Sequence, residues 1–212
     1  MEDYQKIKAK SNPSIILRVY PGHFVTPNSH INYYVDMTDM KSRQSEATAV
    51  AEAISQFYLS SSVIDTILCM DGCEVIGAYL ADNLTRAGII SMNAHKTIYV
   101  MTPEISSAGQ MIFRENIRHM VKGKHVLVLF ASATTGRTIA SAVNTVRYYG
   151  GEITGVSAIF SALSEVDGIT ITRLYGPEDL DGYESYPHAG CKLCERNIPI
   201  DAICNSYGFS RV

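Results

Sequence analysis

The sequence has few cysteines and no long apolar run. A membrane-spanning helix needs about 20 consecutive apolar residues, and no segment approaches that length. The N-terminus, MEDYQKIKAK, is charged, and the apolar core of a secretory signal does not follow it. Five irregularly spaced cysteines are too few for a disulfide framework. We therefore expect a cytoplasmic protein with reduced thiols and no membrane partner.

The sequence also lacks an excess of positive charge. The formal net charge is -3, and lysine and arginine are scattered along the chain. A basic field that attracts nucleic acid is therefore absent, and no nucleic-acid partner is expected. The 212 residues are 46% hydrophobic and 18% charged, enough to bury a core. Residues 1–212 are thus expected to form a single domain.

Strand and helix patterns alternate along most of the chain. Apolar residues recur at helical spacing between Ser42 and Ser61, after a strand-like stretch HINYYVDM and a possible cap at Ser42 or Ser45. Further strands are predicted at 63–70, 95–101, 125–130, 152–162 and 169–175, and further helices at 74–88 and 138–151. Residues 103–124 show no sustained period and predict a mobile loop with room for a short helix, and the tail after 176 is turn-rich. This alternation predicts an α/β fold, a parallel sheet with helices on both faces.

One loop between a strand and a helix is suited to holding a phosphate. The sequence ATTGRT follows the strand at 125–130, where a helix N-terminus offers unpaired N–H groups at the carboxyl edge of the sheet. The threonines supply hydroxyls, the glycine lets the backbone curl, and the arginine adds charge. The predicted phosphate-binding residues are Ser132, Ala133, Thr134, Thr135, Gly136, Arg137 and Thr138. An equally open alternative is that the threonines only cap a helix.

The stretch VLVLFASATTGRT resembles the phosphoribosyl pyrophosphate (PRPP) signature of type I phosphoribosyltransferases, in a degenerate form. Three more stretches, GHFVTPNSHINYYVDM, DTILCMDGCEVIGAYLADNL and CKLCERNIPI, resemble the orotate phosphoribosyltransferase branch in the same order. The resemblance covers about nine tenths of the chain. It implies that fold with a small hood, built from about 1–40 and 176–212.

The resemblance also implies ligands and positions for them. It implies a role in nucleotide (pyrimidine) metabolism, with PRPP or a nucleotide 5′-phosphate bound through loop 132–138. A nucleobase that the sequence does not identify, magnesium for productive PRPP binding, and a homodimer are implied as well. The pyrophosphate loop falls on Asp71, Gly72 and Cys73, and the side of the base falls on His23, Phe24 and Tyr34. A purely structural role for these residues also stays open. A turn after a strand needs residues such as Asp71 and Gly72, and histidines are common in surface loops without a ligand.

The sequence departs from the family at several charged positions. The two acidic residues of the signature are replaced by Phe130 and Ala131, and an arginine–lysine pair by Thr102 and Pro103, with no lysine until Lys122. Removal of one preorganised electrostatic group typically costs about 10²- to 10³-fold in rate. These losses argue against ordinary turnover, and catalytic residues stay unknown. Three hypotheses stay open: an orotate-type transferase with replacement groups, a non-catalytic sensor of PRPP or a nucleotide, and a structural subunit.

The tail contains a pair of cysteines at a spacing found in zinc sites. Cys191 and Cys194 form a Cys-x-x-Cys sequence, but a structural zinc ion needs four ligands. His188 and Cys204 are the nearby candidates in the sequence. The interpretation without a metal is favoured at this point.

Overall fold

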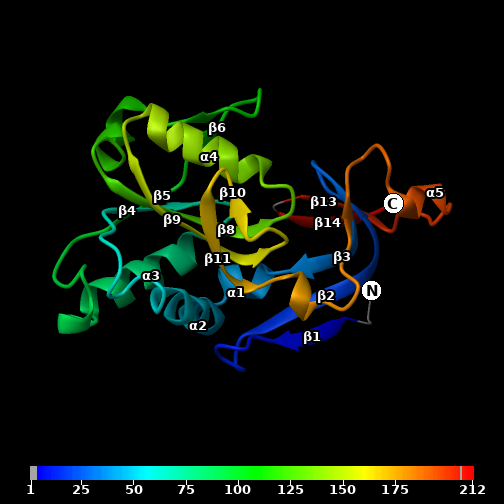
Figure 1. The fold of residues 1–212 in the computed structure, drawn as a ribbon, viewed down its shortest axis with the longest axis horizontal. Coiled ribbons are helices and arrows are strands. Elements are labelled where there is room, and N and C mark those ends of the chain that lie inside the picture. The colour runs from blue at the N-terminus through cyan, green and yellow to red at the C-terminus, as the bar shows by residue number, and fades with distance from the viewer. Residues whose placement is uncertain (1–3, 206) are drawn as a thin grey trace.

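The computed structural model describes residues 4–205 and 207–212, and its centre is a mostly parallel sheet. The strand order is β10-β11-β9-β8-β4-β5, with only the edge strand β10 antiparallel (Figure 1). The bounds are β4 Thr66–Cys69, β5 Tyr99–Met101, β8 His125–Ala133, β9 Glu152–Ser161, β10 Glu165–Val166 and β11 Ile169–Tyr175. The predicted α/β class with a parallel sheet is confirmed.

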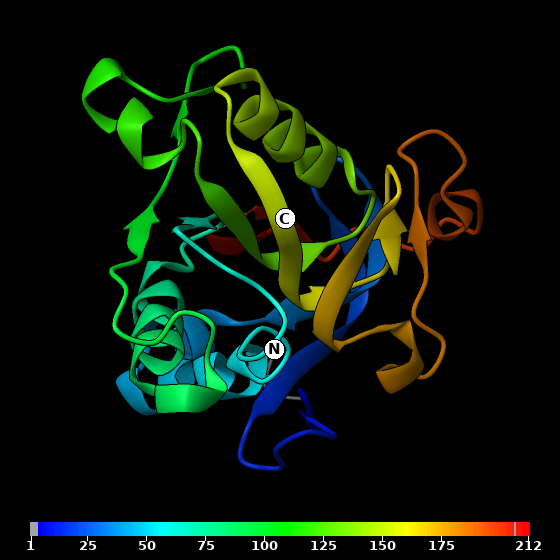
Figure 2. The same cartoon turned by 60° about the vertical axis from the view of Figure 1, so that its left-hand side comes forward.

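Helices cover both faces of this sheet (Figures 1 and 2). The helices α1 Thr38–Ser42, α2 Gln44–Ser55 and α3 Glu74–Arg86 lie on one side, and α4 Arg137–Tyr148 lies on the other. Alternate residues of β8 enter the two cores: Leu127, Leu129 and Ala131 on the side of α2 and α3, Val128 and Phe130 on the side of α4. A parallel strand buried on both faces reads as a continuous apolar run, as β8 does.

A second sheet packs beside the first and forms a hood over one end of it. Its order is β12-β3-β2-β13-β14, with β1 on β2. The bounds are β1 Gln5–Lys8, β2 Ile16–Val25, β3 His30–Asp36, β12 Ser185–Tyr186, β13 Ala202–Asn205 and β14 Gly208–Arg211. The tail, read as mostly irregular, thus supplies three short strands and the short helix α5 Lys192–Glu195. The two ends of the chain meet because β13 runs parallel to β2.

Strand β2 continues through a sequence that reads as a turn. The register shifts between Pro21 and Phe24, so Pro21 and Gly22 lie in a bulge rather than at the end of the strand. A Cβ atom on Gly22 would lie 2.7 Å from Asp201 Oδ2 and 2.9 Å from the Phe24 ring. Glycine suits this position because it has a positive φ of 157° and the Asp201 carboxylate and the Phe24 ring lie close to it.

The segment predicted as a mobile loop contains regular structure. It holds the hairpin of β6 Glu104–Ile105 and β7 Met111–Ile112, followed by the 3₁₀ helix η2 Glu115–Met120. Arg114 donates to both carboxylate oxygens of Glu104, at 2.7 and 2.5 Å. Two further 3₁₀ turns are η1 Gly88–Ile90 and η3 Pro177–Asp179.

Two sequence expectations about helices can be compared with the described residues. No helix among them is both long enough and apolar enough to cross a bilayer. The helix α2 begins at Gln44 behind Arg43, without a side-chain cap. Neither Ser42 nor Ser45 therefore caps it, and Glu46 in the first turn is the residue that complements the helix dipole.

Candidate functional site

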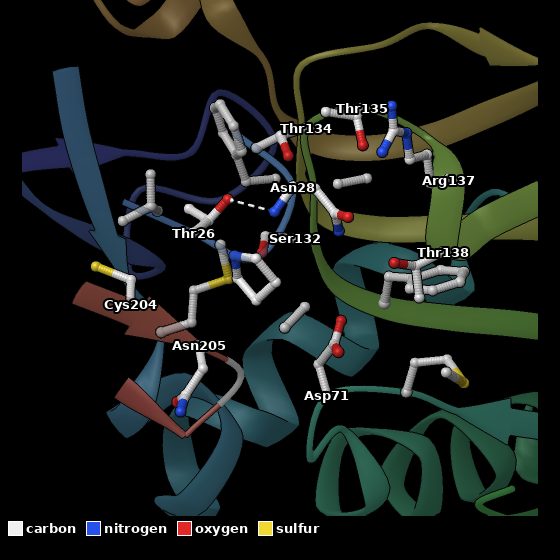
Figure 3. A pocket seen from close by; sticks show the side chains of 18 of the residues that line it. Thr26, Asn28, Asp71, Ser132, Thr134, Thr135, Arg137, Thr138, Cys204 and Asn205 are labelled. Carbon is white, nitrogen blue, oxygen red and sulfur yellow. Dashed lines mark hydrogen bonds between the residues drawn. The ribbon is translucent and has the colours of Figure 1, made fainter. Parts of the chain in front are cut away.

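A cleft of about 620 Å³ lies between the carboxyl ends of the central strands and the hood. The loop from β8 to α4 forms one wall, and Thr26 and Asn28 of the hood lie on the opposite side (Figure 3). Tyr34 of the hood also lines the cleft. Asp71, which follows β4, lies at its base, and Ile105 and Met111 of the β6–β7 hairpin also line it. Ligands of parallel α/β sheets bind at this edge.

The β8–α4 loop presents an unfilled set of donors to this cleft. Gly136 precedes α4 in the left-handed conformation, with φ 73°, and no side chain caps the helix. Among the described residues, the hydroxyls of Thr134, Thr135 and Thr138 have no hydrogen-bond partner. The threonines therefore do not cap α4, and both their hydroxyls and the first N–H groups of the helix are available to an anion.

The close turn at Gly136 depends on the absence of a side chain. A Cβ atom there would lie 2.7 Å from Val166 Cγ2 and 2.9 Å from Leu163 Cδ1. The side chains of the β9–β10 connection and of β10 therefore press against the loop from behind. This packing holds the loop curled toward the cleft.

The charges at the cleft are mixed, with two cations and one acid among the described lining residues. Lys41 and Arg137 supply positive charge, and Asp71 is the one carboxylate. Lys41 Nζ donates to the backbone oxygen of Asp71 at 2.8 Å. Burial raises the pKa of the Asp71 carboxyl, although the Lys41 charge and the Ala131 N–H oppose the rise. Asp71 also has a left-handed backbone, with φ 56°, which is strained for a residue other than glycine.

The structure brings some of the predicted site residues together and leaves others apart. All seven residues of 132–138, together with Asp71 and Tyr34, line the cleft. Four predicted residues do not line it: Gly72, Cys73, His23 and Phe24. Cys73 is buried in the core below α3, and burial raises the pKa of its thiol. His23 and Phe24 are buried within the hood.

Lys41, Tyr183 and Asn205 are among the lining residues that sequence reasoning missed. Lys41 lies in a short helix whose pattern gives no hint of a ligand. Asn205 ends β13, a strand of four residues that is too short to be recognised in the sequence. Tyr183 has a buried hydroxyl without a hydrogen-bond partner in the described part of the chain. Its position in a turn-rich tail carries no signal of a site.

The two positions that are acidic in the resembling family hold core residues that also line the cleft. Phe130 is 1% exposed and packs under α4, and Ala131 is 5% exposed on the other face of β8. Protein-held magnesium needs carboxylate ligands alongside the phosphates of a substrate. Only Asp71 offers one among the described lining residues, and the Lys41 ammonium lies beside it. The cleft therefore lacks the acidic pair through which the family resemblance implies magnesium binding, and Asp71 is the one carboxylate among the described lining residues that could hold the ion beside a phosphate.

The comparisons with known proteins find matches in structure alone. No protein-family model matches the sequence, and no curated protein matches it. The solved orotate phosphoribosyltransferase of Mycobacterium tuberculosis in complex with PRPP has a TM-score of 0.52 and 18% identity, over 69% of this chain and 82% of that chain. A phosphoribosyltransferase of Corynebacterium diphtheriae has a TM-score of 0.53 and 20% identity, over 77% and 90%. The adenine phosphoribosyltransferase of Leishmania donovani has a TM-score of 0.51 and 14% identity, over 84% and 89%.

These similarities define the class of fold. The chain has the type I phosphoribosyltransferase fold, as predicted. Its structural neighbours include both orotate and adenine enzymes, so the fold does not assign a base.

Proposed function

We propose that this protein binds the 5′-phosphate of PRPP or of a nucleotide in loop 132–138 and does not transfer the ribose. Its role would be that of an orotate phosphoribosyltransferase-like sensor or regulatory subunit in pyrimidine metabolism. The observation that carries the proposal is a cleft with an open phosphate loop and no carboxylate from β8.

Binding and transfer place different demands on the cleft. A phosphate is held by helix N–H groups, hydroxyls and a cation, which the loop and Arg137 supply. Transfer also requires stabilisation of a cationic sugar and a leaving pyrophosphate. The groups for this second task are absent at Phe130 and Ala131, and the β6–β7 hairpin brings Ile105 and Met111 to the cleft instead of a lysine. Recognition can therefore persist without chemistry.

Asp71 favours a second candidate function, in which the protein is an active transferase. This carboxylate faces the cleft beside Lys41, where it can take part of the role of the missing acids. A side chain from a second copy of the chain would have to supply the rest, because a homodimer is the assembly that the sequence resemblance implies. This function requires that magnesium strengthen PRPP binding.

The first test is calorimetric titration of PRPP into the purified protein, with and without magnesium. The proposal expects binding that magnesium does not strengthen, and no turnover with orotate or other bases. Binding that tightens with magnesium, followed by turnover that Asp71→Ala abolishes, would establish the second candidate instead. Absence of binding to PRPP and to nucleotides would leave a purely structural subunit.

A variant pair locates the binding at the loop. Thr135→Tyr fills the phosphate loop with a ring and should abolish binding without unfolding the protein. Thr170→Tyr is the matched control, because Thr170 is exposed on β11 outside the cleft and tyrosine suits a strand. Retained affinity in Thr135→Tyr, with both variants folded by circular dichroism, would contradict the assignment of the loop.

A further inference from the structure

Four potential metal ligands meet at the outer side of the hood, away from the cleft. His23 lies in the bulge of β2 and His30 begins β3, while Cys191 precedes α5 and Cys194 lies within it. Their ligand atoms all lie within 4.8 Å of one another. Figure 1 shows α5 beyond the hood, on the side opposite the central sheet. None of the four residues lines the cleft.

The separations within this cluster resemble the edges of a tetrahedral metal site. Cys191 Sγ and Cys194 Sγ each lie 3.7 Å from His23 Nε2, and Cys194 Sγ lies 3.5 Å from His30 Nδ1. Zinc bonds of about 2.3 Å to sulfur and 2.0–2.1 Å to nitrogen place these atoms about 3.6 Å apart in a tetrahedron. The two ring nitrogens are 2.8 Å apart and would have to separate by about 0.5 Å to reach the tetrahedral edge.

The neighbours of His23 orient its ring for this role. His23 Nδ1 lies 2.9 Å from the carbonyl oxygen of Ile198, which can only accept, so Nδ1 carries the proton. The unprotonated Nε2 therefore faces the cluster, as a metal ligand requires. The His23 N–H donates to Asp201 Oδ2 at 2.7 Å, and the Asp201 N–H donates to the His23 oxygen at 2.8 Å. The backbone that carries the ring is thus fixed on both sides.

We propose that His23, His30, Cys191 and Cys194 bind one structural zinc ion. The set supplies two imidazoles and two thiols, and thiolate with imidazole favours zinc over magnesium or calcium. Four protein ligands leave no open position for a substrate, so the site is structural rather than catalytic. Both thiols lose their protons to solvent when the ion binds.

The partners of the Cys-x-x-Cys pair differ from the candidates that the sequence offers. His188 and Cys204 lie outside the four-residue group, and two histidines more than 160 residues upstream take their place. Only the pairing of the tail with β2 and β3 brings them to the cysteines. The ion would tie α5 to the β2–β3 hairpin, whose turn carries Thr26 and Asn28 of the cleft wall.

The first measurement is the metal content of the protein purified in reducing buffer without added chelator. About one zinc per chain is expected, and replacement by Co²⁺ should give the absorption of a tetrahedral ion with thiolate charge transfer. Cys194→Ala should lose the zinc and lower Co²⁺ affinity by more than the roughly 10- to 100-fold typical of changes outside a ligand set. The matched controls Cys204→Ala and His188→Ala should keep one zinc per chain.

Thiol alkylation of the wild-type protein tests the site without relying on variants, which could fail to fold. Cys194 is exposed, so its thiol should be alkylated rapidly after chelation and protected after zinc is restored. A folded protein with free thiols that takes up neither zinc nor Co²⁺ would overturn the proposal. A Cys191–Cys194 disulfide that, once reduced, yields a chain unable to bind metal would overturn it as well. Neither result would bear on phosphate binding, which is measured separately.

Discussion

The substitution Gly136→Ala tests whether the β8–α4 loop, the proposed phosphate site, is held in its curled form by the side chains behind it. Two costs add at this position. Left-handed backbone costs a residue with a Cβ atom about 1–2 kcal/mol relative to glycine. The new atom would also lie 2.7 Å from Val166 Cγ2 and 2.9 Å from Leu163 Cδ1, and overpacking of this kind costs about 1–3 kcal/mol. The expected loss of unfolding free energy is therefore about 2–5 kcal/mol.

Gly168→Ala separates the two costs. Gly168 has φ 77°, close to the φ of 73° at Gly136, but no atom lies within 4 Å of the position of its added Cβ. It should lose only the backbone contribution of about 1–2 kcal/mol. The difference between the two variants, about 1–3 kcal/mol, then measures the contact with Val166 and Leu163.

Urea denaturation at 25 °C provides the assay, with thermal melting as a second reading. For a chain of this size each kcal/mol corresponds to about 2–4 °C, so Gly136→Ala should lower the melting temperature by about 4–20 °C. A phosphate titration of the folded variant should also show weakened binding, because the loop must move to relieve the overlap. Equal losses in the two glycine variants would refute the claim that side chains of the β9–β10 region support the loop.

Two more predictions concern charged groups. Asp71→Asn removes a negative charge from the cleft and should tighten sulfate binding. Because burial raises the pKa of Asp71, the sulfate affinity of the wild type should approach that of the variant as the pH falls through this pKa. Calorimetry at several pH values measures both affinities, and a ratio between them that does not change with pH would contradict this reasoning. Burial raises the pKa of Asp65, but hydrogen bonds from the His125 N–H and ring outweigh this and lower it. The stability that Asp65 contributes is therefore present above pH about 4 and is lost as pH falls through the folded-state value. Asp65→Asn should lower the free energy of unfolding by about 1 kcal/mol at pH 7. In urea denaturation at a series of pH values, the variant should also lose less stability than the wild type as the pH falls below about 4. An equal loss in both proteins would contradict the pairing of Asp65 with His125.

The central sheet could be predicted from the sequence because its signals are local. The strand at 169–175 has the predicted bounds, since four β-branched residues open it and a tyrosine closes it. The β8 run continues three residues further than predicted, to Ala133, because the strand pairs with β9 up to Ser161. The phosphate loop was placed at the carboxyl end of β8 for the same reason: the order of strand, loop and helix fixes which edge of the sheet it occupies.

The hood could not be predicted in the same way because it depends on pairing between distant segments. Strand β13 has four residues, and it is recognisable only beside β2, which lies more than 170 residues upstream. The same pairing places Asn205 in the cleft and His23 near Cys191. Pro21 and Gly22 read as a turn, yet the neighbouring Asp201 carboxylate holds the His23 N–H and lets the strand continue through a bulge.

The packing of Phe130 predicts that an acidic residue at this position would destabilise the fold. The ring is 1% exposed and belongs to the core under α4. Loss of a buried phenylalanine costs about 3–5 kcal/mol, a large part of the roughly 5–15 kcal/mol that keeps a domain folded. An aspartate there would also bury a carboxylate among the apolar side chains under α4, and burial of a charge in apolar surroundings is costly. The same side chain therefore supports the fold at a position where the resembling family has an acid, while the loop that begins four residues further on lines the cleft.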